Sequence, residues 1–178
     1  MLEHLTELAE LGWLVSRLSS VGRRRSNSGG ELMIFDLCTG QRLTTLIGHT
    51  KPVTAVACTQ LDGTPIAVSA AGDYIHGGGE VMVWDLRTGL QRTTLIGHTK
   101  PVRAVACTQL DGTPIAITGA GYYGHGGGEV MIWDLRTGRL QQSFAMPYPV
   151  GSLACDPNNG VVVGTATEVV RLECAHSC

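Results

Sequence analysis

The sequence predicts an all-β protein assembled from repeated units, and three observations carry that prediction. The run Trp-Asp-Leu-Arg-Thr-Gly occurs at 84–89 and again, 49 residues later, at 133–138. A related run, Phe-Asp-Leu-Cys-Thr-Gly, stands another 49 residues upstream at 35–40. The composition combines 24 glycines with only 5% aromatic residues, which is typical of many short strands joined by tight turns. A fixed period of this length indicates stacked equivalent units, each burying its apolar face against a neighbour.

The individual strands follow from short apolar runs that turn residues separate. In each copy, a run of Val, Met, Ile, Trp or Phe ends in Asp-x-x-Thr-Gly, where the Asp can bond amides of its own turn and the Gly supplies a positive φ. A more polar strand then returns and makes a hairpin. The predicted strands are 31–37, 41–47, 53–59 and 66–70, then 80–86, 90–96, 102–108 and 115–119, then 129–135, 139–145, 150–155 and 161–165.

Further turns complete each unit as a four-stranded antiparallel meander. Asp-Gly pairs at 62–63 and 111–112 are strong signals for two-residue hairpins, and the polar run 156–160 predicts the corresponding turn in the third copy. The innermost runs lack clean alternation, as expected for strands that neighbouring sheets cover on both faces. Four-stranded units arranged radially make a propeller.

The pattern Gly-His … Trp-Asp with four strands per unit resembles that of the WD-repeat β-propeller family. The resemblance covers about residues 31–173 and is strongest in the two central units. The third unit is degraded, with Met-Pro at 146–147 near the expected Gly-His, and the first has Phe35 in place of Trp.

The resemblance implies that a loop His, a Ser or Thr and the Trp form a hydrogen-bonded set inside each blade. The recurring Asp after each Trp is best explained as a turn cap. The family usually has a further Asp six residues before the Trp, but Gly78 and Gly127 stand there, so we expect an incomplete set and looser blades. By position, the structural blade set comprises His49, Ser69, Trp84, Asp85, His98, Thr118, Trp133 and Asp134.

The ends of the chain are predicted separately from the blades at 31–173. Leu2, Leu5, Leu8 and Ala9 fit a helical stripe, yet residues 8–21 also resemble a degenerate repeat hairpin. We therefore expect residues 1–30 to form a short N-terminal helix or a degenerate repeat followed by a linker. Residues 174–178 are a tail.

The number of units is small for a propeller. The chain has room for three to four blades of 49 residues, whereas propellers have typically about 4–8. The sequence thus predicts an incomplete propeller, and three explanations remain open. Two copies could complete one ring, with strands from 150–165 of one pairing with 31–47 of the other; the chain could be a fragment; or residues 1–30 could cap the array.

Composition narrows the class of partner. The net charge of −2 favours neither nucleic acid nor an anionic membrane, and no stretch approaches the length of about 18–20 apolar residues that spans a bilayer. Three of the six cysteines occupy equivalent places in successive units, which is unlike a secreted disulfide framework. We expect a cytoplasmic protein without a cofactor.

The glycine-rich loops at 72–79 and 121–128 are the most individual part of the chain. They should emerge on the same face as the Gly-His loops, since both connect strands at the same end, with His49 and His98 lying deeper. Tyrosines offer contact area at low entropic cost, and glycines let a loop adapt. The candidate partner-binding rim comprises Tyr74, His76, Tyr122, Tyr123 and His125.

These features favour a non-catalytic scaffold that binds other proteins. Although His-Gly-Gly-Gly at 76–79 and 125–128 mimics an esterase oxyanion loop, no Gly-x-Ser-x-Gly turn accompanies it, so we predict no enzyme and no catalytic residue. A metal shared by His76 and His125, or held by Cys174, His176 and Cys178, is disfavoured, and no metal site is predicted. The alternatives are a small-ligand or metal-binding sensor using the Tyr/His loops, and a truncated nonfunctional propeller fragment.

Overall fold

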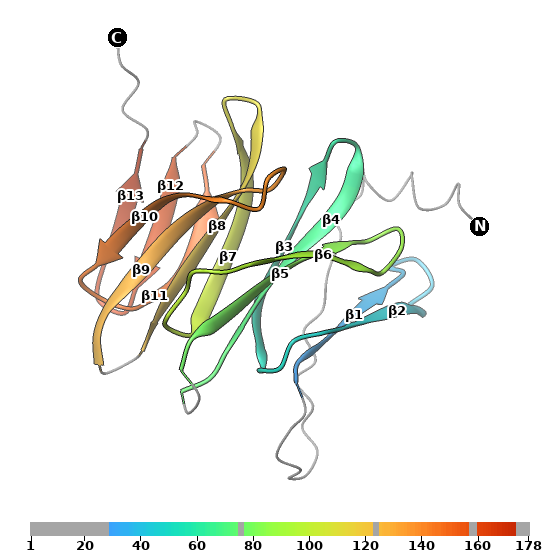
Figure 1. The fold of residues 1–178 in the computed structure, drawn as a ribbon, viewed down its shortest axis with the longest axis horizontal. Helices are drawn as coiled ribbons and strands as arrows, with labels where there is room; N and C mark the ends of the chain where they lie inside the picture. The colour runs from blue at the N-terminus through green and yellow to red at the C-terminus, as the bar shows by residue number, and fades with distance from the viewer. Residues whose placement is uncertain (1–28, 75–76, 123–124, 157–159, 174–178) are drawn as a thin grey trace.

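The computed structural model describes residues 29–74, 77–122, 125–156 and 160–173 as an all-β molecule (Figure 1). The described residues contain strands and no helix, which confirms the predicted fold class. The possible helix or repeat before residue 29 and the tail at 174–178 lie outside the described residues. The strands are β1 Glu31–Phe35, β2 Arg42–Ile47, β3 Val53–Leu61, β4 Thr64–Gly72, β5 Gly79–Asp85, β6 Gln91–Leu95, β7 Val102–Leu110, β8 Thr113–Tyr122, β9 His125–Asp134, β10 Leu140–Met146, β11 Val150–Cys155, β12 Val161–Thr165 and β13 Val169–Leu172.

The strands form four antiparallel sheets that follow one another along the chain. The second sheet is β3-β4-β5-β6 and the third is β7-β8-β9-β10, so both are four-stranded meanders. Among the described residues, the first sheet has the two strands β1-β2 and the fourth has the three strands β11-β12-β13. Each boundary between sheets falls at the segment that follows an outer strand, such as Gly48-His49 between β2 and β3.

Strand β13 corrects one expectation about assembly. The sequence prediction left β12 with a free edge that strands of another copy could use. In the structure, β13 pairs with β12 through Val161↔Leu172 to Gly164↔Val169. The edge of β12 is therefore occupied within the chain, so a strand of another copy could pair there only by displacing β13.

The sheets stack through two chemically different faces. In the second sheet, Ala67, Met82 and Trp84 pack against Leu32 and Ile34 of the first sheet. The opposite face, which includes Val68, Val81 and Val83, packs against the third sheet around Trp133. We call these the Trp face and the Val face. Side chains of a strand alternate between faces, so every other residue serves one interface.

The same arrangement recurs between the third and fourth sheets. Ile117 and Val130 on the Val face of the third sheet pack against Val161 and Val163 of the fourth. Burying one such aliphatic side chain contributes about 1.5–3 kcal/mol. The stability of the array therefore comes from the interfaces between sheets, as the repeat predicts.

Glycines in the segments predicted as loops allow the next sheet to approach closely. A methyl group on Gly72 would lie 2.7 Å from Pro101 Cα, and one on Gly121 would lie 2.7 Å from Pro149 Cα. The segment 121–128 is also less of a loop than predicted. Strand β8 continues to Tyr122, and β9 begins at His125, which pairs with Tyr122.

Candidate functional site

A chain of hydrogen bonds inside the second sheet links its two central strands to the preceding loop. The Trp84 indole N–H donates to Ser69 Oγ at 2.8 Å. Ser69 Oγ lies 2.6 Å from His49 Nε2, and His49 Nδ1 lies 3.1 Å from Glu80 Oε2. The Thr50 amide donates to the same carboxylate at 2.9 Å. The set therefore connects β4, β5 and the Gly-His segment.

The third sheet repeats this arrangement with Thr in place of Ser. The Trp133 indole N–H donates to Thr118 Oγ1 at 2.8 Å. Thr118 Oγ1 lies 2.7 Å from His98 Nε2, and His98 Nδ1 lies 2.7 Å from Glu129 Oε1. The structure thus brings together the His, Ser or Thr and Trp of each central unit, and adds a fourth member.

Glu80 and Glu129 are the members that the sequence reading missed, and they correct the expectation of an incomplete set. The family resemblance implies an Asp at the position where Gly78 stands. Each Glu lies four residues before its Trp, and residues an even number apart in a strand share a face. The longer Glu side chain reaches the His from this nearer position. The acidic residue recurring on the Trp side of each third strand is the signal that could have identified it.

The hydrogen-bond partners determine where the protons of the set lie. If Ser69 accepts from Trp84, its own hydroxyl can donate to His49 Nε2, and the Nδ1–H of a neutral His49 can donate to Glu80. Burial lowers the pKa of His49, and the hydrogen bond and charge of Glu80 oppose this only in part. A neutral His49 therefore satisfies every member of the set.

The two carboxylates are stabilised in the ionised form. Burial alone would raise the pKa of Glu80, but hydrogen bonds from the Thr50 hydroxyl, His49 and the Thr50 amide lower it overall. For Glu129, the hydrogen bond from His98 is the main cause of a lowered pKa, and burial opposes it. Each carboxylate is therefore a fixed acceptor for its His.

The order Ser69–His49–Glu80 matches that of a nucleophile, base and orienting carboxylate, although the sequence predicts no catalytic residue. The burial of the two hydroxyl groups argues against a catalytic role for these sets. Ser69 and Thr118 are both 0% exposed, and each oxygen already accepts an indole N–H. A nucleophile must reach a substrate atom, and neither oxygen can. The sets are structural elements of the sheets.

The Asp that follows each Trp fixes a turn. Asp85 Oδ1 accepts the amides of Arg87 and Thr88 at 2.9 and 3.0 Å. Asp134 Oδ1 does the same for Arg136 and Thr137 at 2.7 and 3.1 Å. These carboxylates act on local backbone at the opposite end of the sheets from the glycine-rich hairpins (Figure 1).

Part of the predicted rim forms a cluster of aromatic and cationic side chains. Tyr74 is 52% exposed, and its ring lies 6.3 Å from that of Tyr122 between centroids. The guanidinium of Arg103 lies 4.3 Å from the centre of the Tyr74 ring, close enough for a cation–π interaction. Arg103 also donates to the carbonyl of Gly121 at 3.4 Å. We call Tyr74, Arg103 and Tyr122 the rim cluster.

Arg103 is the one difference between the near-identical segments 44–67 and 93–116, where Thr54 is its counterpart. Thr54 Oγ1 donates to the carbonyl of Val102 at 2.6 Å and so stays within the interface between sheets. The larger Arg103 instead reaches the ring of Tyr74. The difference between Thr54 and Arg103 therefore supplies the cation of the rim cluster.

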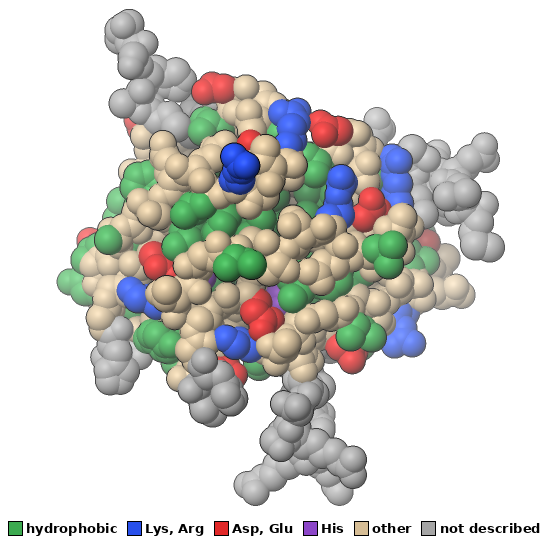
Figure 2. All heavy atoms as spheres, in the orientation of Figure 1, with side chains coloured by type: hydrophobic (Ala, Val, Ile, Leu, Met, Phe, Trp, Pro, Cys, Tyr) green, Lys and Arg blue, Asp and Glu red, His purple; other side chains and the backbone are tan. Residues whose placement is uncertain are grey.

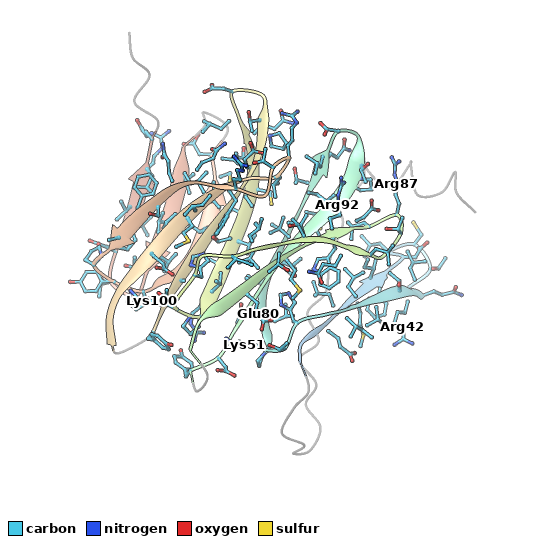
Figure 3. All side chains as sticks on the ribbon, viewed as in Figure 1. Arg42, Lys51, Glu80, Arg87, Arg92 and Lys100 are labelled. Carbon is cyan, nitrogen blue, oxygen red and sulfur yellow. The ribbon has the colours of Figure 1, made fainter. Side chains whose placement is uncertain are left out.

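Lysines of the loops between sheets hold the glycine-rich segments in place. Lys51 Nζ donates to the carbonyls of Gly77 and Gly78, the latter at 3.1 Å, and Lys100 Nζ donates to that of Gly127 at 2.7 Å. Figure 3 shows Lys51, Glu80 and Lys100 at the same lower edge of the molecule. The backbone next to the rim cluster is thus fixed by side chains that the sequence reading did not single out.

The remaining rim candidates cannot be placed in this cluster. His76 and Tyr123 lie outside the described residues, and only the backbone of His125 is described, as the first residue of β9. Within the described ranges, no three His, Cys, Asp or Glu side chains gather as a metal site would require.

The cysteines of the described residues are free thiols. Burial raises the pKa of Cys58 to about 11. It also raises the pKa of Cys155 and, together with the neighbouring thiols of Cys58 and Cys155, that of Cys107. The thiolate is the reactive form, so these three thiols are inert packing groups.

Comparisons with known proteins bear on the fold. No family model matches the chain, and no curated protein matches it. Many solved structures are similar to it. One is described as the structure of the Dos1 propeller, with a TM-score of 0.59 at 14% sequence identity. The match covers 75% of this chain and 37% of that one, so the chain spans little more than a third of the protein it resembles.

A likeness at this level of identity concerns the fold alone. Together with the four successive antiparallel sheets, it shows that this chain folds as an incomplete β-propeller.

Proposed function

We propose that this chain is a non-catalytic protein-interaction scaffold of the WD-repeat type, and that the rim cluster contacts its protein partner. The observation that carries the proposal is the half-exposed Tyr74 ring held between Arg103 and Tyr122. Tyr and Arg are enriched among the residues that dominate binding energy at protein interfaces. A ring already ordered by its neighbours loses little conformational entropy when it is buried by a partner.

The electrostatics and the cysteines support this assignment. The net charge of −2 provides no general attraction for nucleic acid or an anionic membrane surface, so proteins are the proposed partners. In the described part of the chain, no helix has the length and hydropathy needed to cross a bilayer. Free thiols at Cys58 and its equivalents fit a reducing compartment, and we place the protein in the cytoplasm on that ground.

A homo-oligomer that completes the ring stays a second proposal. The face of β1 that points away from the second sheet carries the half-buried side chains of Met33 and Phe35. An apolar face at the end of an array attracts a complementary sheet. A single sharp monomer mass in light scattering at high protein concentration would contradict this second proposal.

The rim proposal is tested by affinity capture with matched variants. The double variant Tyr74→Ser with Arg103→Thr removes the ring and restores the residue found at the equivalent position in the preceding sheet. We expect it to lose specific protein partners that the unmodified chain captures, identified by mass spectrometry. The control is Leu90→Thr, which alters an exposed apolar residue in the turn after β5, at the opposite end of the sheet, and should retain them.

Two results would contradict the proposal. One is capture of the same proteins by the unmodified chain and the double variant. The other is loss of the same proteins in the Leu90→Thr control. A thermal shift with small ligands or metal ions that disappears in the double variant would instead favour the ligand-binding alternative, since a bound ligand stabilises the folded state.

A further inference from the structure

A groove opens between the third and fourth sheets, away from the rim cluster. It has a volume of about 320 Å³. Its apolar walls come from both sheets, and a few polar side chains also line it. Figure 2 shows hydrophobic side chains at the surface above β9 and β10, among fewer charged ones. The lining includes Ile117, Val130, Ile132, Phe144, Val161 and Leu172, with Gln109, Gln142 and Glu173 as polar members.

The groove exists because Leu172 occupies the position that Trp holds in the preceding sheets. Strand register shows the equivalence, since Ala67 pairs with Trp84, Ala116 with Trp133, and Val161 with Leu172. Trp84 and Trp133 are each 1% exposed and fill the space between their sheet and the one before it. A leucine is smaller than an indole and leaves part of that space empty.

The empty space leaves Phe144, on the third sheet, partly exposed. Leu95 and Phe144 are equivalent, because they pair with Val81 and Val130 at the same place in successive sheets. Leu95 is 1% exposed, because it packs against the third sheet in the cluster that contains Trp133. Phe144, in contrast, is 37% exposed at the groove. An aromatic side chain on an outer strand is therefore left without the cover that its counterpart has.

The strand next to the groove also offers backbone hydrogen bonds. In the second and third sheets, the strand that carries the Trp pairs on both sides. Within the described residues, β13 pairs on one side only, with β12. An extended segment added to this edge would gain main-chain hydrogen bonds, and its residue opposite Leu172 would face the groove.

We propose that the groove and the β13 edge together bind an extended segment of a partner protein, which adds as the fourth strand of the last sheet and places a Trp or Tyr side chain in the groove. The chemistry of the occupant follows from the repeat itself, because an aromatic side chain fills the same space twice elsewhere in the chain. Gln142 and Glu173 supply acceptors for an indole N–H or a phenol at the margin. This site is separate from the rim cluster and does not depend on it.

The test uses the full chain and short capped peptides with fluorescence anisotropy as the readout. The probe is Lys-Thr-Val-Thr-Trp-Thr-Val-Thr-Lys, and its partner peptide has Ala in place of Trp. A third peptide is N-methylated on alternate amides, so that it cannot add as a strand. We expect the Trp peptide to bind, and both others to bind more than about tenfold more weakly.

Variants of the protein locate the binding. Leu172→Trp restores the side chain found in the preceding sheets, so it should fill the groove, retain or raise the melting temperature and weaken the Trp peptide more than about tenfold. Phe144→Glu should weaken it similarly by placing a charge in the groove. The matched control is Ile96→Glu, which alters an exposed apolar residue after the outer strand of the second sheet and should leave binding unchanged.

Three outcomes overturn the proposal. They are no binding of the Trp peptide to the unmodified chain, equal binding to Leu172→Trp, and binding that N-methylation leaves unchanged. If a second copy occupied the groove, the mass in solution would rise with protein concentration, and Leu172→Trp would abolish that rise. The Trp peptide would not bind. Occupation by residues 1–28 would appear as a cross-link from that segment to β13 with no peptide bound. Both results also contradict a partner segment in this groove.

Discussion

The carboxylates of Glu80 and Glu129 convert each buried His into a fully bonded group. His49 is buried, so an Nδ1–H without an acceptor would carry the cost of an unmade hydrogen bond. Glu80 accepts that bond and also accepts from Thr50, which ties the loop before β3 to the start of β5. One side chain thus connects two segments about 30 residues apart in sequence.

We predict that Glu80→Gln lowers the free energy of unfolding by about 1.5–3 kcal/mol, the range for hydrogen bonds to charged groups. The amide oxygen is a weaker acceptor than a carboxylate. Urea unfolding measures the change. The control is Glu31→Gln, because Glu31 holds the equivalent position in the first sheet but is exposed. Equal effects at both positions would show that the buried set is not responsible.

We also predict that stability falls as pH is lowered. The pKa of His49 is depressed from 6.5 in the folded state, so the unfolded chain binds the proton more readily and stability is lost as pH falls below 6.5. The pKa of Glu80 is depressed from 4.5, so a second loss follows below 4.5, and Glu80→Gln should reduce this second loss. Urea midpoints between about pH 7.5 and about pH 4 measure both. A midpoint that rises between about pH 7.5 and about pH 5.5 would contradict the neutral His49.

The sequence identified eight residues that the structure places in these sets or their turns, but not the two glutamates. The resemblance fixed the His, Ser or Thr and Trp by position, and it also fixed where an Asp should be. It did not show that Glu80, two residues nearer to Trp84 than Gly78, has a side chain long enough to reach His49 Nδ1. Side-chain length and strand parity together would have been needed.

The segments that connect successive sheets contain glycines that leave room for a neighbouring side chain. A methyl group on Gly97 would lie 2.9 Å from the Cη2 atom of Trp133. The indole cannot move aside at low cost, because its N–H is bonded to Thr118. Gly48 has the same relation to Trp84, again at 2.9 Å. The Gly-His pair therefore serves both packing and hydrogen bonding.

We predict that Gly97→Ala destabilises the protein by about 1–3 kcal/mol, as overpacked core sites do. The cost should shrink in a Trp133→Phe background, because a phenyl ring lacks the atoms that the new methyl group meets. Equilibrium unfolding of the two single variants and the double variant gives the coupling. Additive effects would mean that the indole is not the obstacle.

Strand positions were largely predictable, whereas the ends of the strands were not. The Asp-Gly turns appear where expected, with φ of 49° at both Asp62 and Asp111. Segment 121–128 was predicted as a loop from its glycines alone, but β8 and β9 run into it, because glycines there admit Pro149 and the backbone of Tyr148. Composition could not distinguish glycine used for flexibility from glycine used for close packing.

The two ends of the array differ in chemistry. The end at the first sheet presents Met33 and Phe35, whereas the outward face of the last sheet carries Arg171, which pairs with Asp156 at 2.8 Å and with Glu173. Register places Arg171 where the second and third sheets have Val83 and Ile132. Terminal repeats of stacked arrays carry a polar outer face that prevents further stacking.

We predict that Arg171→Val increases self-association, since it restores the apolar residue found at this position in the other sheets. The fold should tolerate the change, because exposed ion pairs contribute only about 0–1 kcal/mol. Sedimentation velocity over a range of concentrations measures it, with the exposed Arg139→Val as control. An unchanged monomer fraction for Arg171→Val would argue against a capping role.

The overall architecture followed from the repeat period, but the number of strands at each end did not. Periodicity predicts that units stack, and the stacked sheets confirm it. It cannot predict where pairing stops once the repeat degrades. Val169–Leu172 has none of the Trp-Asp pattern, yet it forms β13, because Val170 and Leu172 still pack toward the third sheet.

The stacked sheets bury Trp84 and Trp133 with their indole N–H groups bonded inside each sheet. Hydrogen exchange of the ¹⁵N-labelled indoles, followed by nuclear magnetic resonance, measures this protection at each tryptophan. We predict that both protons exchange only when the molecule unfolds, and that Glu80→Gln accelerates exchange at Trp84 more than at Trp133. Exchange at both indoles as fast as in an unfolded peptide would contradict the account.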